Sequence, residues 1–195
     1  MAHAFQRAGD RLNTQLEPVE QMLILQLVDE LSEVLRRPDD PSGRDVDPLA
    51  KELGLEGLTG HAPEPPDNPI AERLLPDGYR DDPDAALEFR RYTDDALRAS
   101  KLADAAVMKA GLEAAADDPD GQLVVELAEA EHWVRAINDL RLALGVELGI
   151  ADDPQQGPDR WEEDDQMAGR AMLYDFLTPA RFDIEINIRR AGTAR

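Results

Sequence analysis

The residues best suited to chemistry are three histidines and several pairs of adjacent aspartates. His3, His61 and His132 lie far apart in the chain, and none belongs to a metal-binding pair spaced as in HExxH. A metal site that combines His132 with Glu129 or Glu131 is the alternative. The aspartate pairs each stand beside a proline, which is typical of helix caps and turns: 39–40, 81–82, 117–118 and 152–153. Walker A, GxGxxG and GxSxG motifs are absent. We therefore expect a protein that is not an enzyme and that needs no metal or cofactor.

Polar residues interrupt a helical pattern in the segment WVRAINDLRLALGVELG, residues 133–149. Five apolar residues recur there at helical spacing and predict one buried face: Trp133, Ile137, Leu140, Leu144 and Leu148. Asn138, Asp139 and Arg141 stand between them. An arginine at the edge of a core lays its stem on apolar surface and carries its guanidinium to a carboxylate. These three residues therefore need polar partners on a neighbouring element.

The segment EFRRYTDD, residues 88–95, offers such partners. Its candidate residues are Glu88, Arg90, Arg91 and Asp94. We expect a polar network between two helices in which Arg141 meets Glu88 or Asp94, while Asp139 pairs with Arg135 one turn earlier. The network would fix the helices together, and a role in binding a partner or ligand is the alternative.

Another candidate for contact with a partner is Trp161, in the acidic segment DRWEEDD. A large aromatic side chain in such a loop is either an anchor for a partner or a lid that folds back on the helices.

The helices that position these residues carry start and stop signals. A first helix begins at Pro18, ends before Pro38 and has a leucine-rich face. Asp82-Pro83 begins a second helix that can run to Ala116, about 50 Å at roughly 1.5 Å per residue. The segment 133–149 and residues 165–178 supply two more. A stripe of mostly small residues on the second helix would let another helix approach closely: Phe89, Thr93, Ala96, Ser100, Ala103 and Val107.

Three segments predict a small antiparallel sheet. Residues 3–16 predict a hairpin that turns at Gly9-Asp10, and QLVVEL, residues 122–127, predicts a strand. The tail at 182–190 alternates apolar and polar residues as a half-buried strand does, so we expect it to pair with residues 11–16 and 122–127. The predicted fold class is mainly α: a helical bundle with long helices and a small antiparallel β element formed from the termini and residues 122–127.

The length of 195 residues suits a single domain, 1–195, with its body at about 18–150. Four further segments complete the predicted organisation: a short helix at 47–54, a mobile linker-like loop at 56–69, an acidic loop at 151–165, and a C-terminal helix and strand at 166–190.

Charge and composition exclude several classes of function. The formal net charge of −21 opposes direct binding to nucleic acid unless a local basic patch survives; it favours a basic protein partner or merely maintains solubility. Without cysteine the chain has no disulfide, thiol switch or cysteine ligand. No segment has the apolar character of a signal peptide or a membrane span, so we expect a cytoplasmic protein with no membrane contact.

Two of these segments resemble a known family. LLPDGYRDDPDAALEFRRYTDDALRASK (74–101) and WVRAINDLRLALGVELG (133–149) are similar to the actinobacterial oxidative-stress-regulator-like (AosR-like) family, formerly a domain of unknown function. That family's pattern is a leucine-rich first helix, an LLPDAY-like turn, EFRR and NDLRLALG, and all four occur here in order. The resemblance implies regulation of transcription under oxidative stress through a protein partner, with a sigma factor or RNA polymerase suspected.

Alternatives to this function remain open. The family's association with genes for a protease adaptor and for cysteine synthesis makes a module of adaptor-dependent proteolysis one alternative, and an interaction protein with no redox role another. Because cysteine is absent, methionine oxidation is the remaining side-chain route to redox control, and a weak one, since methionines on helices are usually buried. The candidates are Met22, Met108, Met167 and Met172. A homodimer through the small-residue stripe or the C-terminal strand is a further hypothesis.

Overall fold

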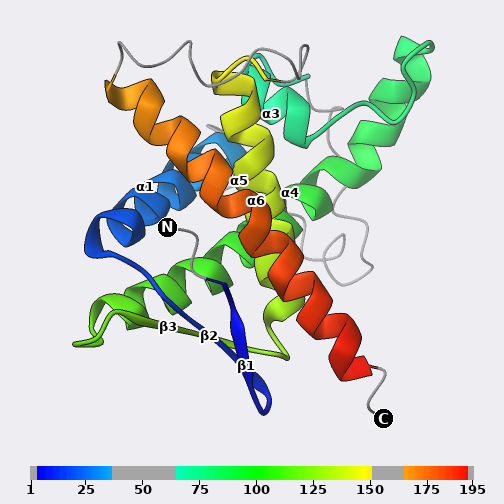
Figure 1. The fold of residues 1–195 in the computed structure, drawn as a ribbon. Helices are drawn as coiled ribbons and strands as arrows, with labels where there is room; N and C mark the ends of the chain where they lie inside the picture. The colour runs from blue at the N-terminus through cyan, green and yellow to red at the C-terminus, as the bar shows by residue number, and fades with distance from the viewer. Residues whose placement is uncertain (1–3, 37–64, 151–164, 193–195) are drawn as a thin grey trace, which may run out of the picture.

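The computed structural model describes residues 4–36, 65–150 and 165–192 (Figure 1). The described residues form five helices and three strands, in this order: β1 (Gln6–Ala8), β2 (Arg11–Gln15), α1 (Pro18–Leu35), α3 (Pro69–Leu74), α4 (Pro83–Ala116), β3 (Gln122–Glu126), α5 (Ala130–Glu147) and α6 (Asp165–Gly192). A mainly α fold with a small antiparallel sheet is confirmed. The expected helix at 47–54, most of the two expected loops and Trp161 lie outside the described residues.

The helix α5 lies at the centre of the helical body, where it contacts α1, α3, α4 and α6 (Figure 1). Its predicted core face is buried along its whole length, from Trp133 to Leu148. In the view of Figure 1, α6 crosses in front of α5 and α4 runs behind it. Side chains on opposite sides of α5 therefore meet different neighbours.

Signals at the helix starts explain where α1, α3 and α4 begin. The backbone N–H of Glu17 donates to Glu20 Oε2 at 2.9 Å, and Asp82 Oδ1 accepts from the N–H of Ala85 at 3.0 Å. In the same way Asn68 accepts from the N–H groups of the first turn of α3. The sequence interpretation missed α3, although Asn68-Pro69 is the same kind of signal as Asp82-Pro83.

The sheet has the order β1-β2-β3, with all neighbours antiparallel. The hairpin between β1 and β2 turns at Gly9, whose φ of 65° lies in the left-handed region that favours glycine. Leu12 of β2 stands opposite Val125 of β3, and both side chains are fully buried. The predicted hairpin and the predicted small antiparallel sheet containing residues 11–16 and 122–127 are confirmed, but these two segments pair with each other rather than with the C-terminal tail.

The predicted C-terminal strand is wrong, because residues 182–190 continue α6. Buried positions recur at helical spacing through this region: Leu173, Leu177, Ala180, Ile184 and Asn187. The apolar residues that alternate along this segment therefore lie on different faces of α6. Ile184 is buried, whereas Phe182 and Ile186 are exposed. Pro179 lies within α6 without ending it. Its fixed φ suits a helix, but the missing N–H leaves one helical hydrogen bond unmade. One hypothesis placed a homodimer contact on a C-terminal strand. Because this segment is helical, that contact has no strand to form it.

Gly111 allows α4 and α5 to cross closely. An added Cβ at Gly111 would lie 2.6 Å from Cζ2 of Trp133, and this indole is only 2% exposed. The tryptophan is therefore unable to move aside without disturbing the core.

We expect Gly111→Ala to lower the free energy of unfolding by about 1 kcal/mol. Overpacking a core costs about 1–3 kcal/mol, whereas replacing a helical glycine returns roughly 0.5–1 kcal/mol. Urea unfolding followed by circular dichroism measures the difference. Gly145→Ala on α5 is the matched control, because an added Cβ there meets no heavy atom within 4 Å. Unchanged or higher stability of Gly111→Ala would contradict close packing at this crossing.

Candidate functional site

The polar residues at 88–95 and 138–141 belong to three separate groups of contacts rather than to one network. The first group fixes the start of α4, the second joins α4 to α5, and the third joins α5 to α6. Glu88 is exposed, while Arg91 and Asn138 are half-buried on their helices.

The first group is centred on Arg90, which is 6% exposed. Its guanidinium approaches the carbonyl of Leu75 at 3.5 Å, forms an ion pair with Asp77 and lies 3.5 Å from Asp94. The buried Asp94 also accepts from Arg98 at 2.7 Å, and Arg98 donates to the carbonyl of Leu35 at 3.0 Å. These contacts attach both the turn before α4 and the end of α1 to α4.

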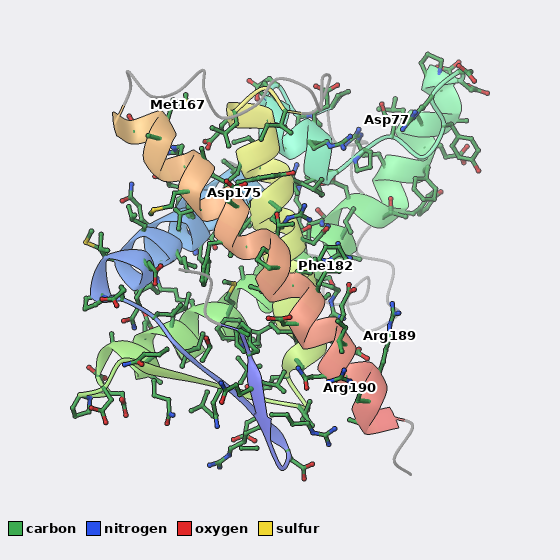
Figure 2. All side chains as sticks on the ribbon, viewed as in Figure 1. Asp77, Met167, Asp175, Phe182, Arg189 and Arg190 are labelled. Atoms are coloured by element: carbon green, nitrogen blue, oxygen red, sulfur yellow. The ribbon has the colours of Figure 1, made fainter. Side chains whose placement is uncertain are left out.

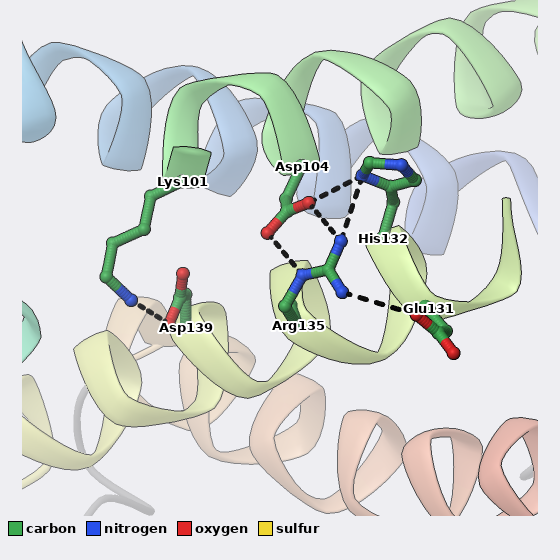
Figure 3. Close-up of polar contacts among 6 residues, drawn as sticks. All are labelled: Lys101, Asp104, Glu131, His132, Arg135 and Asp139. Atoms are coloured by element: carbon green, nitrogen blue, oxygen red, sulfur yellow. Dashed lines mark hydrogen bonds and ion pairs between the residues drawn. The ribbon is translucent and has the colours of Figure 1, made fainter. Parts of the chain in front are cut away.

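The second group joins α4 to α5 (Figure 3). Lys101 Nζ lies 2.7 Å from Asp139 Oδ1, so Asp139 pairs with Lys101 and not, as expected, with Arg135. Arg135 instead donates to both oxygens of Asp104, at 2.8 and 2.9 Å, and His132 Nδ1 lies 2.6 Å from the same carboxylate. The sequence interpretation did not identify Lys101 or Asp104.

The third group corrects the expected partner of Arg141. Its Nε donates to Thr178 Oγ1 at 3.0 Å, and its guanidinium lies 5.3 Å from the centre of the Tyr174 ring. Both partners are on α6, so the expected contact with Glu88 or Asp94 is wrong. Arg141 follows Asp139 by two residues, which is about 200° around a helix. Asp139 therefore faces α4 while Arg141 faces the opposite neighbour.

Two buried carboxyl groups between α4 and α5 have pKa values shifted in opposite directions. Burial acts to raise the pKa of Asp104, but hydrogen bonds from Arg135 and His132 outweigh it and hold that pKa below its usual 3.8. For Asp139 burial dominates, so its pKa lies above 3.8 despite the hydrogen bond from Lys101. Asp104 is thus stabilised as an anion, whereas burial disfavours the anionic form of Asp139 and Lys101 offsets part of that effect.

We expect the difference in unfolding free energy between the wild type and Asp104→Asn to shrink in acid. A carboxyl with a depressed folded pKa stabilises the fold above its unfolded pKa, and this contribution is lost as pH falls through the folded value. The loss should therefore begin below the ordinary aspartate pKa of 3.8. Denaturant unfolding over a pH series measures it, with the exposed Asp84→Asn on the same helix as control. A pH-independent difference would contradict the role of Asp104 as an anion.

The described residues hold no cluster of acidic residues and histidine suited to a metal ion. The alternative of a metal site at His132 with Glu129 or Glu131 is not supported, because His132 instead contacts Asp104. Within the same described ranges, no helix is both long and apolar enough to cross a bilayer.

A groove of about 230 Å³ lies between the turn at 75–78 and the first half of α4. We call it the α4 groove; its lining is mainly apolar (Leu75, Pro76, Gly78, Ala86, Phe89 and Leu97), with the polar Thr93 and the charged Asp77, Arg90 and Asp94. The Phe89 ring covers Gly78, where an added Cβ would lie 2.7 Å from the ring. Tyr79 meets Phe89 edge to face, with the ring centres 5.9 Å apart. The groove thus has an aromatic pair in a defined geometry at its rim.

The α4 groove lies on a part of α4 that extends away from the other helices, next to the labelled Asp77 (Figures 1 and 2). The small-residue stripe was expected to pack against another helix, but Phe89, Ala96, Ser100 and Ala103 are exposed in the described structure. The buried face of α4 is the neighbouring one: Ala86, Arg90, Asp94, Ala105, Met108 and Leu112. One feature of the sequence could have pointed to the groove. Tyr79, Phe89 and Tyr92 lie close together in a chain that is only 5% aromatic.

The comparisons with known proteins cover most of this structure. The model of a family described as a domain of unknown function (DUF2017) matches residues 2–180. The chain belongs to the DUF2017 family. That match includes the α4 groove and all three groups of polar contacts, and it ends just after Pro179 of α6.

Curated relatives connect the DUF2017 chain to regulation. A Mycobacterium bovis protein named oxidative stress regulator AosR is 34% identical over 181 residues, covering 88% of this chain and 79% of the relative. A Mycobacterium tuberculosis protein of the same name matches with the same identity and coverage. The AosR-like resemblance is confirmed, and these names support a regulatory role. No solved structure matches the chain.

Proposed function

We propose that this DUF2017 protein is a cytoplasmic, protein-binding regulator of transcription in a stress response, and not an enzyme. It acts through a sigma factor or RNA polymerase rather than by strong direct binding to DNA. The structural observation that carries the proposal is the α4 groove, a preformed apolar surface with Tyr79 and Phe89 at its rim. Partly exposed aromatic side chains around a pocket are the usual anchors of protein–protein interfaces.

The charge of the chain supports the same choice of mechanism. A formal net charge of −21 repels the phosphates of nucleic acid, so a regulator of this composition reaches a promoter more readily through a protein. The name of the mycobacterial relatives supplies the link to oxidative stress.

Affinity capture tests this proposal. The tagged protein is recovered from lysate of its own host, with and without peroxide, and the bound proteins are identified by mass spectrometry. We expect sigma factor or RNA polymerase subunits in the eluate. Protease and adaptor subunits in their place would replace the proposal with a role in proteolysis.

We expect peroxide to oxidise Met22 and Met172 before Met108. The first two side chains are 58% and 49% exposed although they lie on helices, whereas Met108 is 2% exposed. Peptide mass spectrometry after a short peroxide treatment measures the addition of one oxygen at each site. Equal rates at all three would contradict the described packing of α4.

Redox control through methionine can be tested by comparing the wild type with a variant that lacks the exposed methionines. Peroxide should change partner capture by the wild type but not by a Met22→Leu, Met172→Leu double variant. An identical peroxide response in both proteins would exclude these methionines as the sensor.

A further inference from the structure

We propose that the outward face of α6 binds the same face of a second copy of this chain, with the two helices antiparallel and Phe182 of each copy at the centre of the contact. Such a contact uses one surface twice, and a twofold axis relates the two copies. The family match ends at residue 180, and neither it nor the names of the relatives assigns any contact between copies. The inference goes beyond the proposed function and does not depend on it.

The outward face of α6 is apolar at its centre. Phe182 and Ile186 are 51% and 44% exposed, whereas Ile184 between them is fully buried. At about 100° per residue, Phe182 and Ile186 lie within roughly 40° of each other on the helix, on the side opposite Ile184. In Figure 1, α6 crosses in front of α5, and its C-terminal part extends beyond the body. A second helix can therefore approach this face from the side away from α5.

Opposite charges stand at equal distances on the two sides of Phe182. Asp175 precedes Phe182 by seven residues, Arg189 follows it by seven, and both side chains are exposed. Seven residues make about two helical turns, so both charges return to within roughly 20° of Phe182 around the helix. Figure 2 shows the three residues in this order along α6. In an antiparallel pair centred on Phe182, Asp175 of each copy therefore lies opposite Arg189 of the other.

This arrangement of charge selects a second copy as the partner. A uniformly acidic or uniformly basic helix would meet a like charge at one end of the face, and a parallel copy would place like charges together at both ends. An antiparallel copy meets the opposite charge at each end.

The segment is also electrically balanced in a chain whose formal net charge is −21. From residue 172 to residue 190, three carboxylates accompany three guanidinium groups: Asp175, Asp183, Glu185, Arg181, Arg189 and Arg190. Most of an acidic surface would repel another copy, but this segment carries no net charge to do so.

The aromatic side chain at the centre is already held in place. The guanidinium of Arg181 lies 5.8 Å from the centre of the Phe182 ring, and Arg181 is itself paired with Glu185 at 2.8 Å. A side chain that is ordered before binding loses less conformational entropy on binding. The helical body lies on the buried side of α6, so two copies that meet through their outward faces keep their bodies on opposite sides of the contact.

Sedimentation equilibrium of the full chain tests the inference. We expect the mean mass to rise from one chain toward two as concentration increases, with a weak dimer, because one helix from each copy buries less than the roughly 1,600 Å² of a standard interface. Phe182→Ala should weaken dimerisation about tenfold or more. Phe89→Ala is the matched control, since it truncates a phenylalanine on α4 that is 44% exposed, and it should change dimerisation less than about twofold.

Charge reversal tests the antiparallel register. Asp175→Arg alone brings two arginines together at each end, and Arg189→Asp alone brings two aspartates together, so each should weaken dimerisation several-fold. An equimolar mixture of these two variants should form mixed dimers, because every end then joins opposite charges. Glu88→Arg makes the same change in net charge as Asp175→Arg at an exposed position on α4, and it should leave dimerisation intact.

Three results would overturn the inference. The first is a wild type that stays monomeric at every concentration. The second is a dimer that Phe182→Ala leaves intact or that Phe89→Ala weakens equally. The third is a dimer that neither single charge reversal weakens, since that would exclude the antiparallel pairing. Circular dichroism of each variant confirms that the helices are retained.

Discussion

Replacing Asp94 with alanine is expected to lower the free energy of unfolding by about 3–5 kcal/mol, the range for removing one partner of a buried ion pair. The side chains involved are almost dry, with exposures of 3% for Asp94, 7% for Arg90 and 12% for Arg98. Without the carboxylate, the buried guanidinium groups of Arg90 and Arg98 have less negative charge nearby to balance them. Urea unfolding of the two proteins measures the loss.

A matched control separates this effect from a general sensitivity of α4. Glu88→Ala removes a carboxylate from the same helix, but Glu88 is exposed, and surface charges contribute about 0–1 kcal/mol. A loss in Asp94→Ala no larger than that in Glu88→Ala would show that the ion pairs around Arg90 do not stabilise the fold.

Asp94→Ala should also have a functional consequence. Arg90 is oriented partly by Asp94, and it holds the turn that forms one wall of the α4 groove. At temperatures where the variant remains folded, we expect it to capture less of its partner protein from lysate than the wild type does. Unchanged capture would mean that the wall of the groove does not depend on this ion pair.

The second large effect is expected from Lys101→Met, which should cost about 2–4 kcal/mol at neutral pH. The variant leaves Asp139, 4% exposed, as a buried carboxylate without its nearest cation. Burial already raises the pKa of Asp139, and losing Lys101 raises it further. A carboxyl with a raised folded pKa has its full stability below the unfolded pKa and loses it as pH rises through the folded value. The cost of Lys101→Met should therefore shrink as the medium becomes acidic.

Denaturant unfolding at neutral and mildly acidic pH measures this dependence. Lys109→Met on the same helix is the control, because its partner Asp29 is largely exposed and little change is expected at either pH. The double variant Lys101→Met, Asp139→Leu should recover much of the lost stability, since no unpaired charge remains buried. A loss for Lys101→Met that grows in acid would contradict the arrangement in Figure 3.

Elements that depend on local signals were predictable from the sequence. Leucine spacing and the Pro18 start identify α1, Asp82-Pro83 identifies α4, and Gly9 identifies the hairpin. These signals work because a cap or a turn is satisfied by residues a few positions away. The strand predicted at 182–190 was wrong because the structure of this segment depends on distant residues rather than on nearby ones. Four alternating apolar residues fit a strand locally, but the buried face that α6 presents to its neighbours continues in register through Ile184.

Contacts between elements were harder to predict. Helical geometry alone could have shown that Asp139 and Arg141 face opposite neighbours, because two residues differ by about 200°. Choosing Lys101 for Asp139, or Asp104 for Arg135, requires the position of α4 along α5, which no local pattern contains. The α4 groove was missed for the same reason. Its lining comes from two segments, and the exposure of Phe89 depends on which face of α4 the rest of the chain covers.

Site-specific photo-crosslinking in the living host tests the central claim most directly. A photoreactive residue replaces Tyr92, which is 51% exposed beside the α4 groove, and a second protein carries it at the exposed Glu113 on the same helix. We predict adducts between position 92 and a sigma factor or RNA polymerase subunit, with none from position 113. Adducts from position 92 with protease or adaptor subunits, or polymerase adducts from position 113 alone, would contradict the account.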